Sequence, residues 1–548
     1  MSASDKKKLR KEQIAATLTE KQREQQKEEK KLKIYTIAFI SAMLVLVLVV
    51  VAVLGVRGFK NAGIVEKSTI AAEVAGRELN TVEFNYYYND AISEFYNEWY
   101  DESTGSADSY LQMLGLDTAK PLNEQVQNEE TGATWADYFV EKALEKAKRD
   151  YALADKAKEA GFALPEEDQT TLNNVINNLA SYATIYGFSN ADQYLRNSYG
   201  YGSTEKSYRA YYERTLLAQA YYDNNEANIS YEDKELREYE AEKFNNFSSF
   251  TYDSVYMSYT NFREEGTEDE DGNTTYTEEQ DNAAREAMKA AAELLATATN
   301  KEELEAKLAE VKVAEGVTLK VTENKEVLYT QINGDLAKWL GEEGRTAGQL
   351  EAIPSMSSDA EPKLNGYYIA IFGSRNDNTE PMGNVRHLLV SFEGGEENEE
   401  TGETVYTDEE KAAAKAKAEE LLKKWEEGEK TEASFTELLK KESDDTGVTE
   451  NEGLYENINP ASSYVENFRA WAIDPIRETG DTGIVETEYG YHIMYYVGDS
   501  KLSYRDSMIT EEMRVAEQEA WYNSILEPVA AETKDTSKLH LDLVLNPA

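Results

Sequence analysis

The pattern of hydrophobic and polar positions divides the chain into one apolar run, a helical region and a mixed region. Residues 34–56 form 23 consecutive positions without a charge. From about residue 71 to 248 the apolar positions recur at helical spacing, with Pro165 marking a break between helices. From residue 249 onward, short strand-like runs alternate with helical ones, which predicts an α+β fold for this part of the chain.

The uncharged run Ile34–Val56 is long enough to cross a bilayer with some tilt. Because Lys30, Lys31 and Lys33 directly precede it, we predict that residues 1–33 are a cytoplasmic basic tail and that the bulk of the chain is extracytoplasmic. A cleaved signal peptide is the alternative, but no clear A-x-A site follows the run. The sequence therefore predicts a single-pass protein of the cell membrane, and a Gram-positive bacterium would suit this topology.

Composition narrows the possible partners. The 41% of hydrophobic residues suffices for packed cores, and the absence of cysteine excludes a lipoprotein. Residues 1–33 contain 11 Lys and Arg against 6 Asp and Glu, which leaves 46 against 99 in the remainder. Since so acidic a surface repels phosphate backbones, we expect no nucleic-acid partner. The acidic loop "DEDGNTTYTEE" lacks the glycine of a calcium-binding EF-hand, and we expect no metal and no cofactor.

An internal repeat occupies the second half of the chain. "SVYMSYTNF" (254–262) and "NVRHLLVSF" (384–392) lie 130 residues apart, and a Gly- and Glu-rich loop follows each of them. Each loop leads to a helix start with the capping-box pattern, at Thr277 and at Thr407. Further on, "NGYYIAIFG" corresponds to "YGYHIMYYVG". We therefore predict two related α+β domains in tandem, covering residues 249–375 and 382–499.

A histidine stands inside the apolar strand "EYGYHIMYYV" of the second copy. It is His492, one of only three histidines in 548 residues, and His387 lies in the first strand of the same copy. If the first and last strands pair at the centre of one sheet, both imidazoles lie on a single face. The two rings could then be part of a catalytic site, or they could merely satisfy each other in a core.

The order of motifs around these histidines resembles the parvulin family of peptidyl-prolyl isomerases. The motifs are "VRHLLV", "ESDD", "NEGLY", "YVENFRAWA" and "TEYGYHIM", within residues 384–499. The resemblance implies an enzyme that isomerises X–Pro bonds without a cofactor. It assigns catalysis to His387, Asp445, His492 and Thr487, and it assigns substrate binding to Phe468, Tyr464, Leu454 and Trp471.

The chain departs from the parvulin pattern at several positions. Glu452 replaces a glycine of the Gly-rich turn, and Tyr464 stands where the family usually has methionine. The loop after the first strand, "EGGEENEETGE", is acidic, which favours unphosphorylated clients with basic or neutral residues near the proline. In the first copy, Met257 is aligned with His387 and Tyr368 with His492, so this copy resembles a degenerate parvulin domain without isomerase activity.

A weaker resemblance extends to exported chaperone–isomerases of the PrsA and SurA type. It rests on "VAGRELNTVEF" at 74–84 and "IYGFSNADQYLRNSYG" at 185–200. It implies a helical chaperone domain at 71–248 that is completed by 500–530, within a C-terminal helix and tail at 500–548.

The expected function is a membrane-anchored foldase that acts on newly secreted, unfolded polypeptides. A chaperone or scaffold without catalysis is the alternative, and a tethered adhesin or receptor has little support. The oligomeric state stays open, with a dimer as one option.

Overall fold

The computed structural model describes residues 2–16, 63–268, 274–358, 362–397, 402 and 404–545, which have the α+β composition that the sequence predicts. The predicted membrane span Ile34–Val56 lies outside these residues. Among the described residues, no helix is both long and apolar enough to cross a bilayer. The described residues fall into two compact units: one lies within Glu24–Ser230 and Met513–Ala548, and the other within Met1–Arg23 and Tyr231–Glu512.

The first unit is mostly helical, and its helices begin at polar caps. Asn80 accepts a hydrogen bond from the backbone N–H of Glu83, while Thr134 and Thr204 form capping boxes. Pro165 directly precedes a helix, as the predicted break requires. The elements are α3 (Ile64–Ser68), β1 (Ile70–Val74), β2 (Arg77–Asn80), α4 (Thr81–Glu98), α5 (Asp108–Met113), β3 (Val126–Asn128), β4 (Ala133–Thr134), α6 (Trp135–Glu159), α7 (Glu166–Ile185), α8 (Ala191–Tyr199) and α9 (Glu205–Asn228).

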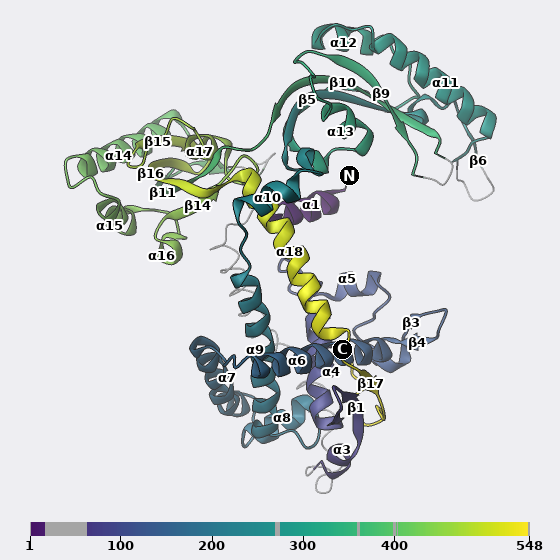
Figure 1. The fold of residues 1–548 in the computed structure, drawn as a ribbon, viewed down its shortest axis with the longest axis vertical. Coiled ribbons are helices and arrows are strands. Elements are labelled where there is room, and N and C mark those ends of the chain that lie inside the picture. The colour runs from purple at the N-terminus through teal and green to yellow at the C-terminus, as the bar shows by residue number, and fades with distance from the viewer. Residues whose placement is uncertain are drawn as a thin grey trace. The chain divides into compact units, whose positions relative to one another are not determined.

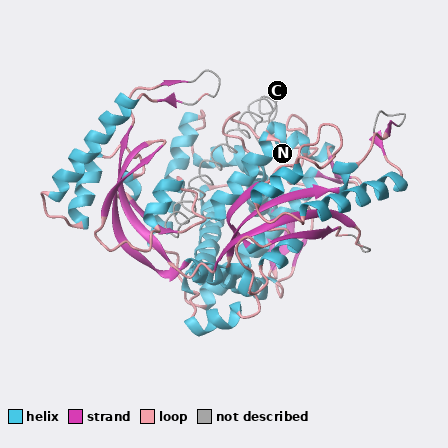
Figure 2. Ribbon diagram, turned by 90° about the horizontal axis from the view of Figure 1, so that it is seen from above, coloured by secondary structure: helices cyan, strands magenta, loops and turns pink. Residues whose placement is uncertain are grey.

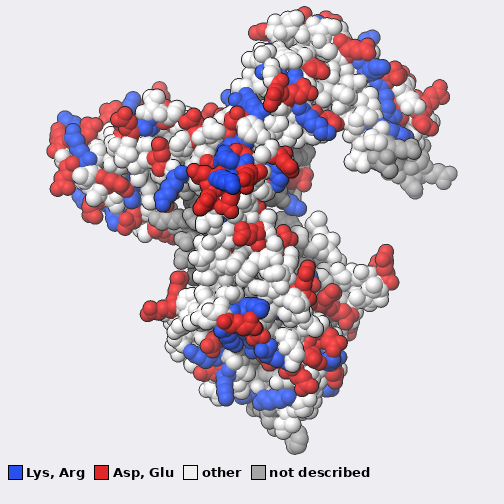
Figure 3. Space-filling view, viewed as in Figure 1, with Lys and Arg blue, Asp and Glu red and all other residues white. Residues whose placement is uncertain are grey.

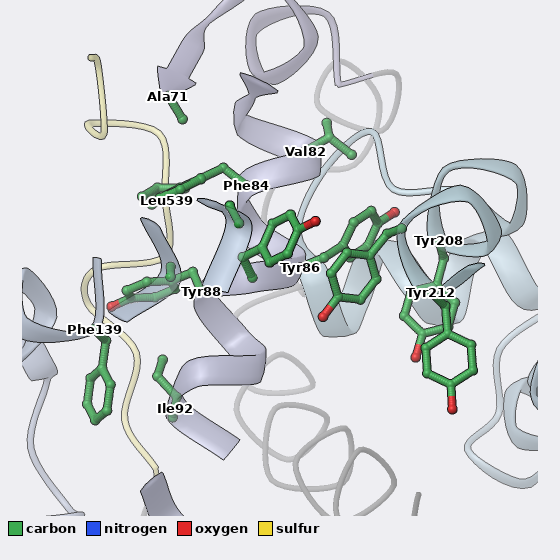
Figure 4. Packing of buried hydrophobic residues seen from close by; sticks show 14 of the residues in the cluster. Ala71, Val82, Phe84, Tyr86, Tyr88, Ile92, Phe139, Tyr208, Tyr212 and Leu539 are labelled. Atoms are coloured by element: carbon green, nitrogen blue, oxygen red, sulfur yellow. The ribbon is translucent and has the colours of Figure 1, made fainter. Parts of the chain in front are cut away.

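Tyrosines form much of the core of the helical unit. Tyr86 and Tyr88 of α4 are fully buried, and Tyr208 and Tyr212 of α9 are nearly so. The ring centroids of Tyr86 and Tyr208 lie 5.5 Å apart in an edge-to-face arrangement. Figure 4 shows these rings among the aliphatic side chains of the same cluster. The tyrosines of "NYYYND" therefore line helix–helix contacts.

The C-terminal segment packs onto this helical unit. Helix α18 (Tyr504–Leu526) places Ile525 in a buried cluster with Leu153 of α6 and Ala218 of α9. Strand β17 (Ala531–Thr533) pairs antiparallel with β1, so that both ends of the unit meet in one three-stranded sheet.

The second unit contains two four-stranded antiparallel sheets of the same topology, with helices against them (Figures 1 and 2). Their strand orders are β8-β5-β10-β9 and β14-β11-β16-β15, which is the order 2-1-4-3 along the chain in both cases. The elements of the first are β5 (Ser249–Ser258), α11 (Glu278–Leu295), α12 (Lys301–Leu308), β8 (Thr322–Leu328), α13 (Gly334–Leu340), β9 (Leu350–Met356) and β10 (Leu364–Asn376). Those of the second are β11 (Pro381–Ser391), α14 (Asp408–Glu426), α15 (Glu432–Glu442), α16 (Val448–Asn451), β14 (Leu454–Ile458), α17 (Glu466–Ala472), β15 (Thr482–Thr487) and β16 (Gly490–Ser503). Helix α10 (Asp233–Glu240) and the 3-10 helix η2 (Phe244–Phe247) precede β5.

A tryptophan–arginine pair recurs at the last helix of each copy, α13 in the first and α17 in the second. The guanidinium carbon of Arg345 lies 3.9 Å from the ring centroid of Trp339, and that of Arg477 lies 4.4 Å from the ring of Trp471. In both pairs the arginine Nε also donates to the backbone carbonyl of the tryptophan six residues earlier. The repeat therefore includes local packing as well as strand order.

The pairing register corrects one position in the alignment of the two copies. His387 lies opposite Met494, two residues beyond His492 on β16. Two residues beyond Tyr368 on β10 stands Ala370, and its partner is Ser254. Met257 instead belongs to the core beneath α11, on the other face of its sheet. Ser254, rather than Met257, therefore occupies the position of His387 in the first copy, while Tyr368 does correspond to His492.

Candidate active site

The two central strands of the second sheet bring the histidines together. His387 on β11 faces Met494, and His492 on β16 faces Leu389, so the two imidazoles are diagonal neighbours on one face. Their Nδ1 atoms lie 3.1 Å apart. Helices α14 and α15 cover the opposite face of the sheet, whereas α17 lies on the histidine face. The central pairing that the sequence predicted is therefore present in the structure.

Two further groups complete a chain of hydrogen bonds. Asp445, in the loop after α15, places Oδ2 3.2 Å from Nε2 of His387. Thr487, at the end of β15, places Oγ1 2.9 Å from Nε2 of His492. The order is thus Asp445, His387, His492, Thr487, and it unites the four residues that the parvulin resemblance assigns to catalysis.

Two proton arrangements satisfy every contact in this chain of groups. With both rings neutral, Thr487 donates to His492, Nδ1–H of His492 donates to His387, and Nε2–H of His387 donates to Asp445. With one added proton, His387 donates from both nitrogens and Nε2–H of His492 donates to Thr487. The Thr487 hydroxyl then turns to the carbonyl of Gly490, at 3.4 Å. The network can therefore take up a proton without losing a hydrogen bond.

Aromatic rings cover the histidine pair. The ring of Phe468, on α17, lies 5.1 Å from the imidazole of His387 and 5.3 Å from that of His492, edge-to-face with both. Tyr464 packs at 5.5 Å from Phe468 and is half-buried. An apolar surface of this kind suits a proline ring, and it lies directly against the polar network.

Burial and charge set the protonation states of the network. His387 and His492 are 4% and 7% exposed. Burial, reinforced by the neighbouring His387, lowers the pKa of His492 to about 3, although Asp445 opposes the shift. The hydrogen bond from His387, together with those from the N–H of Gly447 and the hydroxyl of Tyr455, holds the pKa of Asp445 well below its usual range. The site thus contains a firmly ionised carboxylate and, at neutral pH, an uncharged His492.

Leu454, which the sequence assigned to substrate binding, does not lie in the apolar cluster that contains Phe468. Leu454 pairs with Arg386 on β11, whereas its neighbour Tyr455 pairs with Val385, which lies in the apolar cluster of the histidine face. Because side chains alternate along a strand, Leu454 is on the other face from the histidines. Trp471 packs against the cluster of Phe468 and against Tyr496, and the guanidinium of Arg477 lies over its ring. The structure therefore places Leu454 on the face away from the histidines, and the substrate-binding role of Trp471 stays a prediction.

Tyr455 is the residue that sequence reasoning missed. Its ring lies 4.7 Å from the ring of His387, and its hydroxyl donates to Asp445 Oδ2 at 2.9 Å. The parvulin resemblance assigned no role to this position, so it gave no reason to select Tyr455. Strand alternation after the turn at Gly453 was the signal that could have indicated it.

Glu452 adopts a backbone conformation that favours glycine. Its φ angle is +53°, in the left-handed region, at the position where the parvulin pattern has glycine. Its side chain forms an exposed ion pair with Lys440 at 2.8 Å, which contributes little. We expect Glu452→Gly to raise the free energy of unfolding by about 0.5 kcal/mol. Amide hydrogen exchange in β14 at increasing denaturant would measure the change in the free energy of unfolding. A loss of stability in Glu452→Gly would show that the ion pair outweighs the backbone strain.

The described residues contain no group of three or more His, Cys, Asp or Glu side chains placed to hold a metal ion. What the site offers is an anionic carboxylate, two imidazoles and a hydroxyl against an apolar ring. That chemistry suits noncovalent stabilisation of a polar group bound beside a hydrophobic one.

Comparison with protein families agrees with this geometry. Residues 387–498 match the model of the rotamase family, described as the PPIC-type PPIase domain. The chain therefore contains a peptidyl-prolyl cis–trans isomerase domain of the parvulin type, which includes the histidine pair and all of the aromatic cluster.

Solved structures similar to this chain include two bacterial peptidylprolyl isomerases named PrsA. That of Bacillus cereus is 22% identical over 28% of this chain and 50% of its own length, with a TM-score of 0.18. That of Bacillus anthracis is 21% identical over 28% of this chain and 59% of its own length, with a TM-score of 0.17. The chain thus spans about half to three-fifths of the length of these two proteins. At such TM-scores the similarity carries no argument about the fold. No curated protein matches the chain.

Proposed function

We propose that the chain is a membrane-anchored, extracytoplasmic foldase that isomerises X–Pro bonds in newly secreted polypeptides. The observation that carries this is the network from Asp445 through His387 and His492 to Thr487, which lies against the ring of Phe468. The family match over residues 387–498 supports the same reaction.

The geometry suits a noncovalent mechanism. Rotation about a peptide bond meets a barrier of about 18–20 kcal/mol, because amide resonance is lost in the twisted state. Phe468 and Tyr464 would hold the proline ring in an apolar pocket, and the network beside them would hydrogen-bond the twisted carbonyl or imide nitrogen. A site that binds the twisted form more tightly than either planar form lowers the barrier.

Charge near the domain favours unphosphorylated clients. The strand β11 ends in the acidic hairpin of β12 (Glu396–Glu397) and β13 (Thr404–Val405), where a phosphate-selective site would need basic residues. Acidic side chains are also spread over the lobe that carries α14 and α15, with basic ones among them (Figure 3). Clients with neutral or basic residues next to the proline would fit best.

The remaining parts of the chain have proposed roles that rest on sequence. Ile34–Val56 would anchor the protein, with residues 1–33 in the cytoplasm. The helical unit would hold unfolded clients. The first sheet would be a degenerate parvulin domain, because Ser254 and Tyr368 stand where the second copy has its histidines.

The test is an isomerase assay by NMR exchange on a panel of X–Pro peptides, with the full chain in mild detergent. We expect catalysed exchange that His492→Ala reduces to the uncatalysed rate. The matched control is Tyr368→Ala, which changes the corresponding position of the first copy and should leave the rate unaltered.

A chaperone without catalysis is the second candidate, since Glu452 and Tyr464 both depart from the parvulin pattern. It would be supported if no peptide were isomerised faster than in buffer while aggregation of an unfolded client was still suppressed. That outcome would refute the isomerase.

A further inference from the structure

Tyr455 contacts both partners of the Asp445–His387 hydrogen bond, Asp445 through its hydroxyl and His387 through its ring. Its hydroxyl donates to Oδ2 of Asp445 at 2.9 Å, and Nε2 of His387 lies 3.2 Å from the same oxygen. The other carboxylate oxygen accepts the backbone N–H of Gly447, also at 2.9 Å. The carboxylate is thus oriented by three donors from three separate segments, which leaves it one geometry relative to the imidazole.

The ring of Tyr455 fixes the imidazole from the side. It lies 4.7 Å from the ring of His387, 5.6 Å from that of Tyr464 and 6.0 Å from that of Phe468. Its partner on β11 is Val385, which is fully buried. Tyr455 therefore fills the space between the strand, the histidine and the two rings of the proposed proline pocket.

We infer that Tyr455 is a positioning residue of the isomerase site: its hydroxyl holds Asp445 and its ring holds His387. The catalytic part of this inference rests on the proposed function. With Asp445 held ionised, His387 keeps Nε2–H toward it, which fixes the direction of the hydrogen bonds through His492 to Thr487. Losing the hydroxyl would raise the pKa of Asp445 and loosen that direction.

The sharpest variant is Tyr455→Phe, which removes only the hydroxyl. In the full chain we expect kcat to fall about tenfold, as one charge-assisted hydrogen bond allows, with KM nearly unchanged and the acid limb of the pH–rate profile moved to higher pH. Tyr455→Leu also removes the ring, and it should raise KM as well.

A second readout does not depend on activity. The chain has only three histidines, so histidine labelled with ¹⁵N gives few signals, and the ring shifts of His387 report its tautomer. We expect Tyr455→Phe to change those shifts.

The matched control is Tyr491→Phe. The Tyr491 hydroxyl also donates to a carboxylate, Glu486, at 3.0 Å, but its ring belongs to the core on the far face of the sheet. This variant should change neither the pH–rate profile nor the His387 shifts.

Unaltered His387 shifts and an unaltered pH–rate profile in Tyr455→Phe would overturn the positioning role. An inactive wild-type protein would refute the proposed function instead, while the histidine shifts would still decide whether Tyr455 orders the network.

Discussion

Replacing Arg505 by methionine is expected to lower the free energy of unfolding of its unit by about 3 kcal/mol. Arg505 is 1% exposed and forms an ion pair with Glu240 of α10. Its guanidinium also donates to the backbone carbonyls of Phe244 and Asp377, at 2.8 and 3.3 Å. Methionine would donate to neither carbonyl, and Glu240 would keep only Arg237, which is exposed, as its ion-pair partner. Amide hydrogen exchange in η2 and in the β10–β11 connection of the full chain would measure the loss of stability.

Arg375→Met is the control for this prediction. Arg375 packs over the same ring of Phe244, at 5.1 Å against 4.1 Å for Arg505, but its ion pair with Asp377 is partly exposed. We expect this variant to cost about 1 kcal/mol or less. Equal effects of the two variants would show that ring contact, rather than the buried ion pair, dominates at this junction.

The position of the histidine pair was predictable because one strong local signal coincided with one simple rule. A polar ring inside an apolar strand identifies the strand, and central pairing of the first and last strands places His387 beside His492. Asp445 and Thr487 followed from the order of motifs around them. Asp445 and Thr487 each lie in a short motif of the parvulin pattern, so the alignment of the motifs was enough to select them.

The errors arose where long-range register decides which way a side chain points. Leu454 and Tyr455 are adjacent, and only the pairing with β11 shows which of them faces the histidines. Met257 matched His387 in a gapless alignment, but the pairing register shifts that correspondence by three residues to Ser254, so that Ser258 and Ser391, the last residues of β5 and β11, correspond. A strand shifted by one or three residues exposes the opposite face, and no local pattern reveals such a shift.

The packing of Trp471, in contrast, could be predicted from the internal repeat. "WLGEEGR" and "WAIDPIR" share their tryptophan, an acidic residue three positions on and an arginine six positions on. The recurrence of this pair predicts that Trp471 stacks with Arg477 as Trp339 does with Arg345, and the structure shows both contacts. The substrate-binding role of Trp471 stays a prediction.

Acidification is expected to destabilise the second sheet well before it affects the first. The pKa of His492 is about 3 in the folded protein and near 6.5 when the ring is exposed. Between these values the unfolded state binds a proton that the folded state does not, so unfolding becomes more favourable as the pH falls. Linkage gives about 1.4 kcal/mol per pH unit, or about 2 kcal/mol between pH 6.5 and pH 5. The folded pKa of Asp445 is depressed, so its contribution is present above its unfolded pKa of 3.8 and is lost on further acidification.

Hydrogen exchange in the full chain, corrected for the intrinsic pH dependence, would measure this sheet by sheet. Protection in β11 and β16 should fall between pH 6.5 and pH 5, while protection in β5 and β10 should change little, because their sheet contains no histidine. The variant His492→Asn cannot titrate in this range, so it should flatten the pH dependence of β11 and β16 even if it is less stable throughout. Parallel losses in both sheets, or an unchanged slope in His492→Asn, would mean that groups other than the buried imidazole govern the acid response.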